Sequence, residues 1–100
     1  MVRARPGDRL VVALEENPTT GYGWELEPGR LGMLEEPDTT FEPHGTGAAG
    51  SGGRRTFTFR LTSAGSARPS LVLRRPWEPA DAAIGTWHAV VDVEGAGAGT

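Results

Sequence analysis

The side chains that most often carry enzymatic or metal chemistry are sparse in this sequence. It contains no cysteine, which excludes a thiolate nucleophile, a disulfide and a Cys-based zinc site. Its two histidines, His44 and His88, lie far apart, and the chain has neither an H-E-x-x-H pair nor a G-x-S-x-G motif. We interpret both histidines as surface residues and expect no enzyme activity and no cofactor.

An acidic stretch offers further candidate metal ligands. Its four carboxylates are those of Glu35, Glu36, Asp38 and Glu42. They do not have the regular spacing of an EF-hand calcium loop. We therefore interpret them as the solvated face of a strand and expect no metal site.

Three turn-forming segments are better candidates for binding another molecule. The first has the sequence Asn17-Pro18-Thr19-Thr20-Gly21-Tyr22. Pro18 restricts its own φ and keeps Asn17 out of the helical region, while Gly21 permits the positive φ of a sharp turn. Thr19 and Thr20 would then stand at the tip of a partly preorganised loop. The alternative interpretation is an ordinary hairpin turn.

The second segment, 43–53, is rich in glycine and ends with Gly50-Ser51-Gly52-Gly53. A phosphate-binding loop would need a following helix whose amides face the anion, and a strand pattern follows here instead. Two interpretations remain. The segment is either a flexible linker or a stretch of bare backbone that approaches another backbone closely.

The third segment opens with Arg75-Pro76-Trp77. Trp77 lies between Pro76 and Pro79, and two prolines so close together do not belong inside a strand. We therefore expect Trp77 to be exposed, where Trp and Arg are favoured anchors of protein interfaces. The alternative is a surface ion pair between Arg75 and Glu78, which would contribute little stability.

The elements that must position these segments show hydrophobic alternation with a period of two. It predicts strands at about 8–15, 22–27, 54–62, 69–74 and 86–94. The stretch 31–42 is interrupted by Pro37 and predicts an irregular traverse of two short strands. By the same alternation Tyr22, Trp24 and Trp87 are core residues. Around Pro79–Ala83 we expect a single helical turn at most.

These elements predict an all-β, antiparallel sandwich of about seven or eight short strands. The length of 100 residues suits one domain with one core, at about 8–94, and frayed ends at 1–7 and 95–100. If successive strands alternate in direction, the links 16–21, 43–53 and 75–85 share one end of the sandwich. Loops gathered at one end of a rigid sandwich are typical of a binding site.

Taken in this order, the three segments resemble the loops of the chagasin family of papain-like cysteine protease inhibitors. The matching residues are Asn17-Pro18-Thr19-Thr20-Gly21-Tyr22 with Trp24, then Gly50-Ser51-Gly52-Gly53, then Arg75-Pro76-Trp77-Glu78. The resemblance spans about 8–94. It implies an immunoglobulin-like β-sandwich that inhibits its target reversibly and non-covalently with the loops 17–22, 43–53 and 75–85.

The resemblance also implies a role for each loop. The loop 17–22 would enter the catalytic cleft and place Thr19 and Thr20 near the nucleophilic cysteine. The segment around Gly50–Gly53 would bond to the enzyme's backbone along the unprimed side. Arg75-Pro76-Trp77 would cover the primed side, with Trp77 stacked on an aromatic residue of the protease. The alternative function is an immunoglobulin-like adhesion or carbohydrate-binding module.

Charge and hydropathy exclude other classes of partner. The formal net charge is −3 and all ten basic residues are arginines scattered along the chain, which argues against nucleic-acid binding. No apolar run approaches the roughly 18 residues of a membrane span, and no apolar signal region follows Met1. We expect a monomer whose partner is a papain-like protease, located in the cytoplasm or processed from a secreted or periplasmic form.

Overall fold

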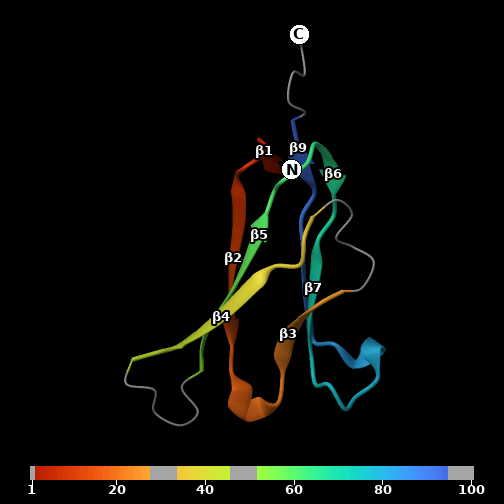
Figure 1. The fold of residues 1–100 in the computed structure, drawn as a ribbon. Coiled ribbons are helices and arrows are strands. Elements are labelled where there is room, and N and C mark those ends of the chain that lie inside the picture. The colour runs from red at the N-terminus through yellow and green to blue at the C-terminus, as the bar shows by residue number, and fades with distance from the viewer. Residues whose placement is uncertain (1, 28–33, 46–51, 95–100) are drawn as a thin grey trace.

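The computed structural model describes residues 2–27, 34–45 and 52–94. In this part of the chain, nine short strands and two single-turn 3-10 helices follow one another (Figure 1). The strands are β1 Val2–Ala4, β2 Arg9–Glu16, β3 Gly23–Leu26, β4 Asp38–Pro43, β5 Gly53–Arg60, β6 Gly65–Ala67, β7 Ser70–Arg74, β8 Gly85–His88 and β9 Val91–Val93. The helices are η1 Pro18–Thr20 and η2 Ala80–Ala82. The all-β prediction is confirmed.

The first layer of the sandwich is the antiparallel sheet β2–β5–β4. β2 and β5 pair along their whole lengths, from Arg9 opposite Arg60 to Glu16 opposite Gly53. β4 pairs with the other edge of β5. The link that leaves β2 and the link that joins β4 to β5 therefore both start from strands held in one register.

The second layer contains the remaining strands, in the orders β3–β7–β8 and β1–β9–β6. The β7–β8 and β6–β9 ladders continue one another in a single register, joined by a hydrogen bond of 3.2 Å from Ala89 N to Pro69 O. The strand predicted at 86–94 is thus interrupted at residues 89–90. Pro69 lies opposite this point and has no N–H to donate, which accounts for the break.

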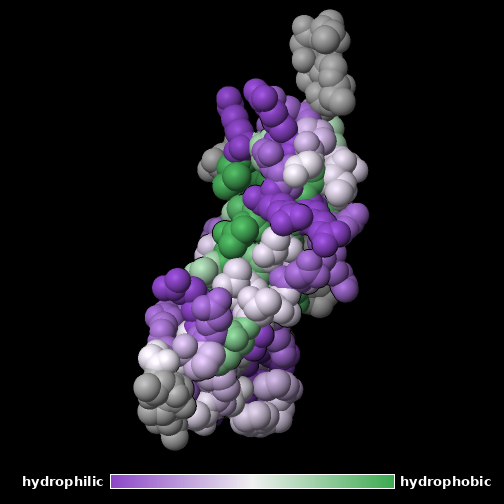
Figure 2. All heavy atoms as spheres, turned by 60° about the vertical axis from the view of Figure 1, so that its left-hand side comes forward, coloured by the Kyte–Doolittle hydropathy of each residue, from purple (hydrophilic) through white to green (hydrophobic). Residues whose placement is uncertain are grey.

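The hydrophobic core lies between the two layers, and its residues are those that the alternation placed inside. Val12 exposes 5% of its surface, whereas its neighbour Val11 exposes 59%. The buried core consists of Val12, Leu34, Phe57, Phe59, Leu61, Ala67, Leu71, Val91 and Val93. Trp24 and Trp87 are half-buried and pack against it. Figure 2 shows a mainly hydrophilic outer face with small hydrophobic groups between the polar side chains.

Two predictions about the strands were wrong, and a third is confirmed in part. Residues 2–4 are not frayed, because β1 pairs in parallel with β9, with hydrogen bonds from Val2 N to Val90 O and from Glu94 N to Ala4 O. The stretch 63–68, for which no strand was predicted between those at 54–62 and 69–74, contains β6. Of the two short strands predicted in 31–42, the second is confirmed as β4. Residues 34–37 form no strand, and the remainder of the predicted first strand falls on residues 31–33. Residues 31–33 and 95–100 lie outside the described part of the chain.

Within the described ranges, no helix is long and apolar enough to cross a membrane.

Candidate functional site

The three candidate loops meet at one end of the sandwich. In Figure 1 the turn between β2 and β3, the facing ends of β4 and β5, and the link from β7 to β8 all lie at the lower end, opposite β1, β6 and β9. The expected clustering is confirmed for residues 17–22, 43–45, 52–53 and 75–85. Gly50 and Ser51 lie outside the described residues.

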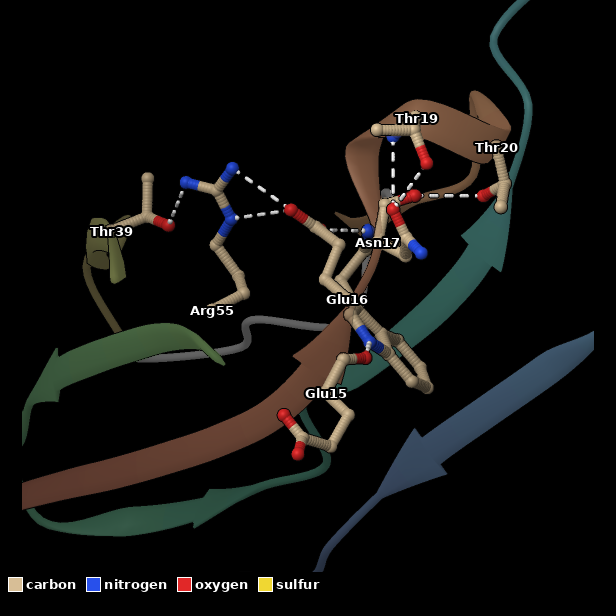
Figure 3. Close-up of polar contacts among 8 residues, drawn as sticks. Glu15, Glu16, Asn17, Thr19, Thr20, Thr39 and Arg55 are labelled. Atoms are coloured by element: carbon tan, nitrogen blue, oxygen red, sulfur yellow. Dashed lines mark hydrogen bonds and ion pairs between the residues drawn. The ribbon is translucent and has the colours of Figure 1, made fainter. Parts of the chain in front are cut away.

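The first loop is held in shape by hydrogen bonds within itself. Asn17 Oδ1 accepts from Thr19 N at 3.1 Å and from Thr19 Oγ1 at 2.6 Å. Asn17 O accepts from Thr20 N at 3.1 Å and from Thr20 Oγ1 at 2.7 Å. Asn17 thus caps η1 through the hydrogen bonds drawn in Figure 3. Pro18 occupies the first position of the helix. The prediction of a partly preorganised tip with exposed threonines is confirmed.

Gly21 ends this short helix in the left-handed region, at φ +82°, and its N–H donates to Pro18 O. A Cβ at Gly21 would lie 2.4 Å from Cη2 of Trp77. The indole ring of the third loop therefore lies directly against the backbone of the first. The glycine serves both the turn and this contact.

Arg75 joins the first and third loops through its side chain. Its Nε donates to Thr20 O at 2.9 Å. Its guanidinium lies 4.3 Å from the centre of the Tyr22 ring and 5.9 Å from that of Trp77, both within cation–π range. The alternative of an Arg75–Glu78 ion pair is not what the structure shows, because the guanidinium faces the first loop. Tyr22, expected in the core, is half-buried beneath Arg75.

Trp77 exposes 71% of its surface, as the flanking prolines predicted. The loop that carries Trp77 is held by polar contacts at its base and not by packing of Trp77 in the core. Arg74 forms an ion pair of 3.1 Å with Glu25 and donates a second hydrogen bond to Glu78 O. Glu78 N donates to Arg75 O at 3.0 Å and closes the turn. A large apolar side chain is thus held in solvent by an ordered polar base.

The described end of the glycine-rich loop packs against the first loop. A Cβ at Gly52 would lie 3.2 Å from Glu16 O and 3.4 Å from Asn17 Cβ. A Cβ at Gly53 would lie 2.3 Å from Glu42 O. The bare backbone at these two glycines thus lies close to the backbone of its own chain. Its approach to the backbone of a binding partner stays a prediction.

An open groove lies between the three loops. Its lining includes Thr20, Tyr22, Gly52, Arg75 and Ile84. Ile84 exposes 62% of its surface and was missed by the sequence reasoning. The alternation of side chains could have predicted this exposure. Trp87 faces inward, and Ile84, three positions earlier, then faces outward.

A buried carboxylate at the base of the loops was also missed. Glu16 Oε2 accepts from Arg55 Nη2 at 3.0 Å and from Arg55 Nε at 3.1 Å, and Oε1 accepts from Trp24 N at 2.8 Å. In Figure 3 Glu16 lies between Arg55 and the loop that carries Asn17, Thr19 and Thr20. The residue faces inward in the same alternation as Val12, one position beyond the predicted end of the strand.

The histidines and the acidic stretch form no organised centre in the described part of the chain. His44 is exposed, with Nε2 at 2.9 Å from Glu15 Oε2, and His88 is exposed on β8. Within residues 2–27, 34–45 and 52–94, no three His, Asp or Glu side chains come together as metal ligands would.

Comparison with known proteins identifies similar chains. The family model described as "Chagasin family peptidase inhibitor I42" matches residues 3–91. Amoebiasin-1 of Entamoeba histolytica is 33% identical over 73 residues, which are 73% of this chain and 71% of that protein. Chagasin of Trypanosoma cruzi is 32% identical over 75 residues, 71% of this chain and 68% of chagasin.

Two solved structures share the fold. The crystal structure of the cysteine protease inhibitor EhICP2 from Entamoeba histolytica has a TM-score of 0.75 at 24% identity, covering 93% of this chain and 85% of that one. The solution structure of amebosin has a TM-score of 0.67 at 31% identity, covering 93% and 87%. The predicted sandwich fold is confirmed by this likeness.

Proposed function

Because the chain belongs to the chagasin family of peptidase inhibitors, we propose that it inhibits papain-like cysteine proteases by closing their catalytic cleft with the three loops at one end of its sandwich. It is an inhibitor and not an enzyme. The loops in question are 17–22, 43–53 and 75–85. The resemblance noted from their sequences is confirmed by the family match, and the alternative of an adhesion or carbohydrate-binding module has no support.

The junction of the first and third loops carries this proposal. Arg75 Nε holds Thr20 O at 2.9 Å, and the Trp77 ring lies against Gly21. Two surfaces of different chemistry therefore stand side by side: a narrow polar tip with exposed Thr19 and Thr20, and an exposed indole. A tip that enters the cleft and an aromatic anchor beside it suit a groove built around a reactive thiolate.

The first loop is also poorly suited to being cut. The carbonyl of Asn17 accepts two hydrogen bonds from Thr20, that of Pro18 accepts one from Gly21, and that of Thr20 accepts one from Arg75. Attack on any of these carbonyls would have to break bonds that hold the loop together. With no cysteine in the chain, a mixed disulfide with the enzyme is excluded as well. The inhibition is accordingly steric and reversible.

We assign the other contacts by position along the cleft. The segment Gly50–Gly53 would bond to the enzyme's backbone on one side of the catalytic cysteine. Arg75-Pro76-Trp77 would cover the other side, where Trp77 is free to stack on an aromatic ring. Loops ordered before binding lose less conformational entropy in the complex, at about 1–2 kcal/mol per residue that need not be frozen.

A titration of papain tests the proposal. Papain cleaving a fluorogenic peptide should lose its activity at about one equivalent of this protein and regain it on dilution, while trypsin keeps its activity. Mass spectrometry of the recovered inhibitor should find residues 17–22 uncut. Full papain activity at a large molar excess, or rapid cleavage within 17–22, would refute the proposal.

A further inference from the structure

Of the charged residues that the structure describes, Glu16 is the one whose side chain is buried; the residue exposes 7% of its surface. A buried carboxylate is costly unless it is paired and hydrogen-bonded. Its position at the last residue of β2 places it directly before Asn17, the cap of the first loop. A buried charge in this position can influence how the first loop leaves the sandwich.

The carboxylate ties together the two ends of the loop 17–23. Glu16 lies before the loop, and Trp24, the residue after it, donates its N–H to Glu16 Oε1 at 2.8 Å. The indole N–H of Trp24 makes a second tie at 2.8 Å to Glu15 O. Both bonds join the end of β2 to the beginning of β3.

These ties replace a ladder that the fold does not supply. In an ordinary β-hairpin, backbone pairing of the two flanking strands closes the loop. Here β2 belongs to the sheet β2–β5–β4 and β3 to the sheet β3–β7–β8, so the loop crosses from one layer to the other. Its base is closed by a side chain where a hairpin would have backbone hydrogen bonds.

Arg55 supplies the counter-charge and the support. Its Nη2 and Nε donate to Glu16 Oε2 at 3.0 and 3.1 Å, so that the two hydrogen bonds are charge-assisted. Arg55 lies on β5, and its guanidinium contacts β4. It lies 5.2 Å from the centre of the Phe41 ring, and its Nη1 lies 3.5 Å from Thr39 Oγ1. The tie is therefore anchored across all three strands of the first layer.

We infer that Glu16 is a positioning residue for inhibition: its carboxylate, neutralised by Arg55, closes the base of the loop 17–23 and holds the tip ready for the protease cleft. The inference rests on the proposed function for its effect on the protease. It assigns Glu16 no contact with the enzyme. The loop's own hydrogen bonds order the tip, and Arg75 and Trp77 contact the tip from the third loop. The Glu16 carboxylate adds the contact at the base, between the residues that precede and follow the loop.

Two substitutions at Glu16 separate its charge from its acceptor atom. Glu16→Ala removes both, and Glu16→Gln keeps an oxygen for Trp24 N while losing the ion pair. We expect the inhibition constant for papain to rise about tenfold or more in Glu16→Ala, a loss of about 1.4 kcal/mol. In Glu16→Gln it should rise about three- to tenfold, because the amide oxygen is a weaker acceptor for Trp24 N and Arg55 no longer holds it in place. Both inhibition constants are measured at a temperature where circular dichroism shows that the variant is folded. If Glu16→Ala does not fold, the inhibition constant of Glu16→Gln tests the inference.

Amide hydrogen exchange measures how stable the hydrogen bond at the base of the loop is, without any protease. In the Glu16 variants, Trp24 N–H should exchange faster relative to Leu61 N–H, which donates to Asp8 O at the opposite end. Val93→Ala is the matched control, because it weakens the core far from the loops. It should leave the Trp24-to-Leu61 exchange ratio and the inhibition constant of the folded protein within about twofold of wild type.

A folded Glu16→Ala or Glu16→Gln protein that keeps both the wild-type inhibition constant within threefold and the wild-type exchange ratio would overturn the inference. Equal losses of inhibition in Val93→Ala would overturn it too, since they would reduce Glu16 to general stability. If wild type itself fails to inhibit papain, the proposed function falls. The exchange ratio then still decides whether Glu16 closes the loop.

Discussion

The middle of the sandwich and its loop end are held together by different interactions. In the middle, apolar side chains such as Phe59 and Leu71 fill the space between two layers with no exposed surface. At the loop end, the contacts are hydrogen bonds to backbone carbonyls, cations against aromatic rings, and an indole resting on a glycine. The first region stabilises the chain, and the second gives three loops a fixed shape in solvent.

This difference implies that stability and inhibition can be changed separately. Core packing is worth several kcal/mol for each large side chain, whereas exposed contacts contribute little to the free energy of unfolding. Truncating an exposed side chain at the loop end should raise the inhibition constant and leave the free energy of unfolding almost unchanged. A core substitution should do the reverse.

The largest effect on the core side is expected from Phe59→Ala. Phe59 is fully buried, so the substitution should lower the free energy of unfolding by about 3–5 kcal/mol through lost burial and a cavity. Urea denaturation measures this loss. The fraction that stays folded should inhibit papain with the wild-type constant; a tenfold weaker constant per folded molecule would break the separation of the two regions.

The largest effect on the loop side is expected from Trp77→Ala. Truncating an aromatic anchor in an interface costs at least about 2 kcal/mol, so the inhibition constant should rise roughly thirtyfold. Because Trp77 is mostly exposed, the free energy of unfolding should change by no more than about 0.5 kcal/mol. An inhibition constant within threefold of wild type would remove Trp77 from the binding surface.

Gly21→Ala sharpens the comparison, with Gly7→Ala as its matched control. Both glycines have positive φ, +82° and +94°, but a Cβ at Gly21 meets the Trp77 ring and a Cβ at Gly7 meets nothing within 4 Å. Each alanine should cost about 1–2 kcal/mol of stability from the left-handed backbone. Gly21→Ala alone should also weaken inhibition, by about tenfold, because the ring must move. Equal inhibition by the two variants would show that the contact between the first and third loops is unimportant.

The smallest effect is expected from Arg60→Ala. Arg60 and Asp38 form an exposed ion pair of 3.5 Å on the first layer, and such pairs contribute about 0–1 kcal/mol. Unfolding in urea should shift within that range, and papain inhibition should be the same as that of wild type. A marked loss of inhibition would place part of the binding surface on the side of the sheet.

The alternation of apolar residues predicted most of the strands because one face of each strand packs on a shared core. It failed where pairing depends on a distant residue: Pro69 interrupts the last strand from the opposite side of the ladder, and β1 is ordered only because β9 lies beside it. Neither condition can be seen in the local pattern of residues 86–94 or 1–7.

The site was predicted in outline for a similar reason. Because successive strands were expected to alternate in direction, the three loops were predicted to lie at one end of the sandwich. The prolines on either side of Trp77 predicted that its side chain is exposed. The bond from Arg75 to Thr20 spans 55 residues of sequence, and the one from Glu16 to Trp24 depends on the loop crossing between layers. The alternation of side chains along β2 and β5 does place Glu16 and Arg55 on the inward faces of two paired strands, so their ion pair could have been predicted. The hydrogen bond from Trp24 N on β3 to Glu16 could not.

Mapping the interface on the isotope-labelled protein tests the central claim most directly. Addition of inactivated papain should change the backbone amide signals of residues 17, 19–22, 52–53, 75 and 77 most strongly and leave those of Leu61 and Val93 unchanged. The strongest changes around β1, β6 and β9 instead would contradict the assignment of the protease-binding surface to the loop end.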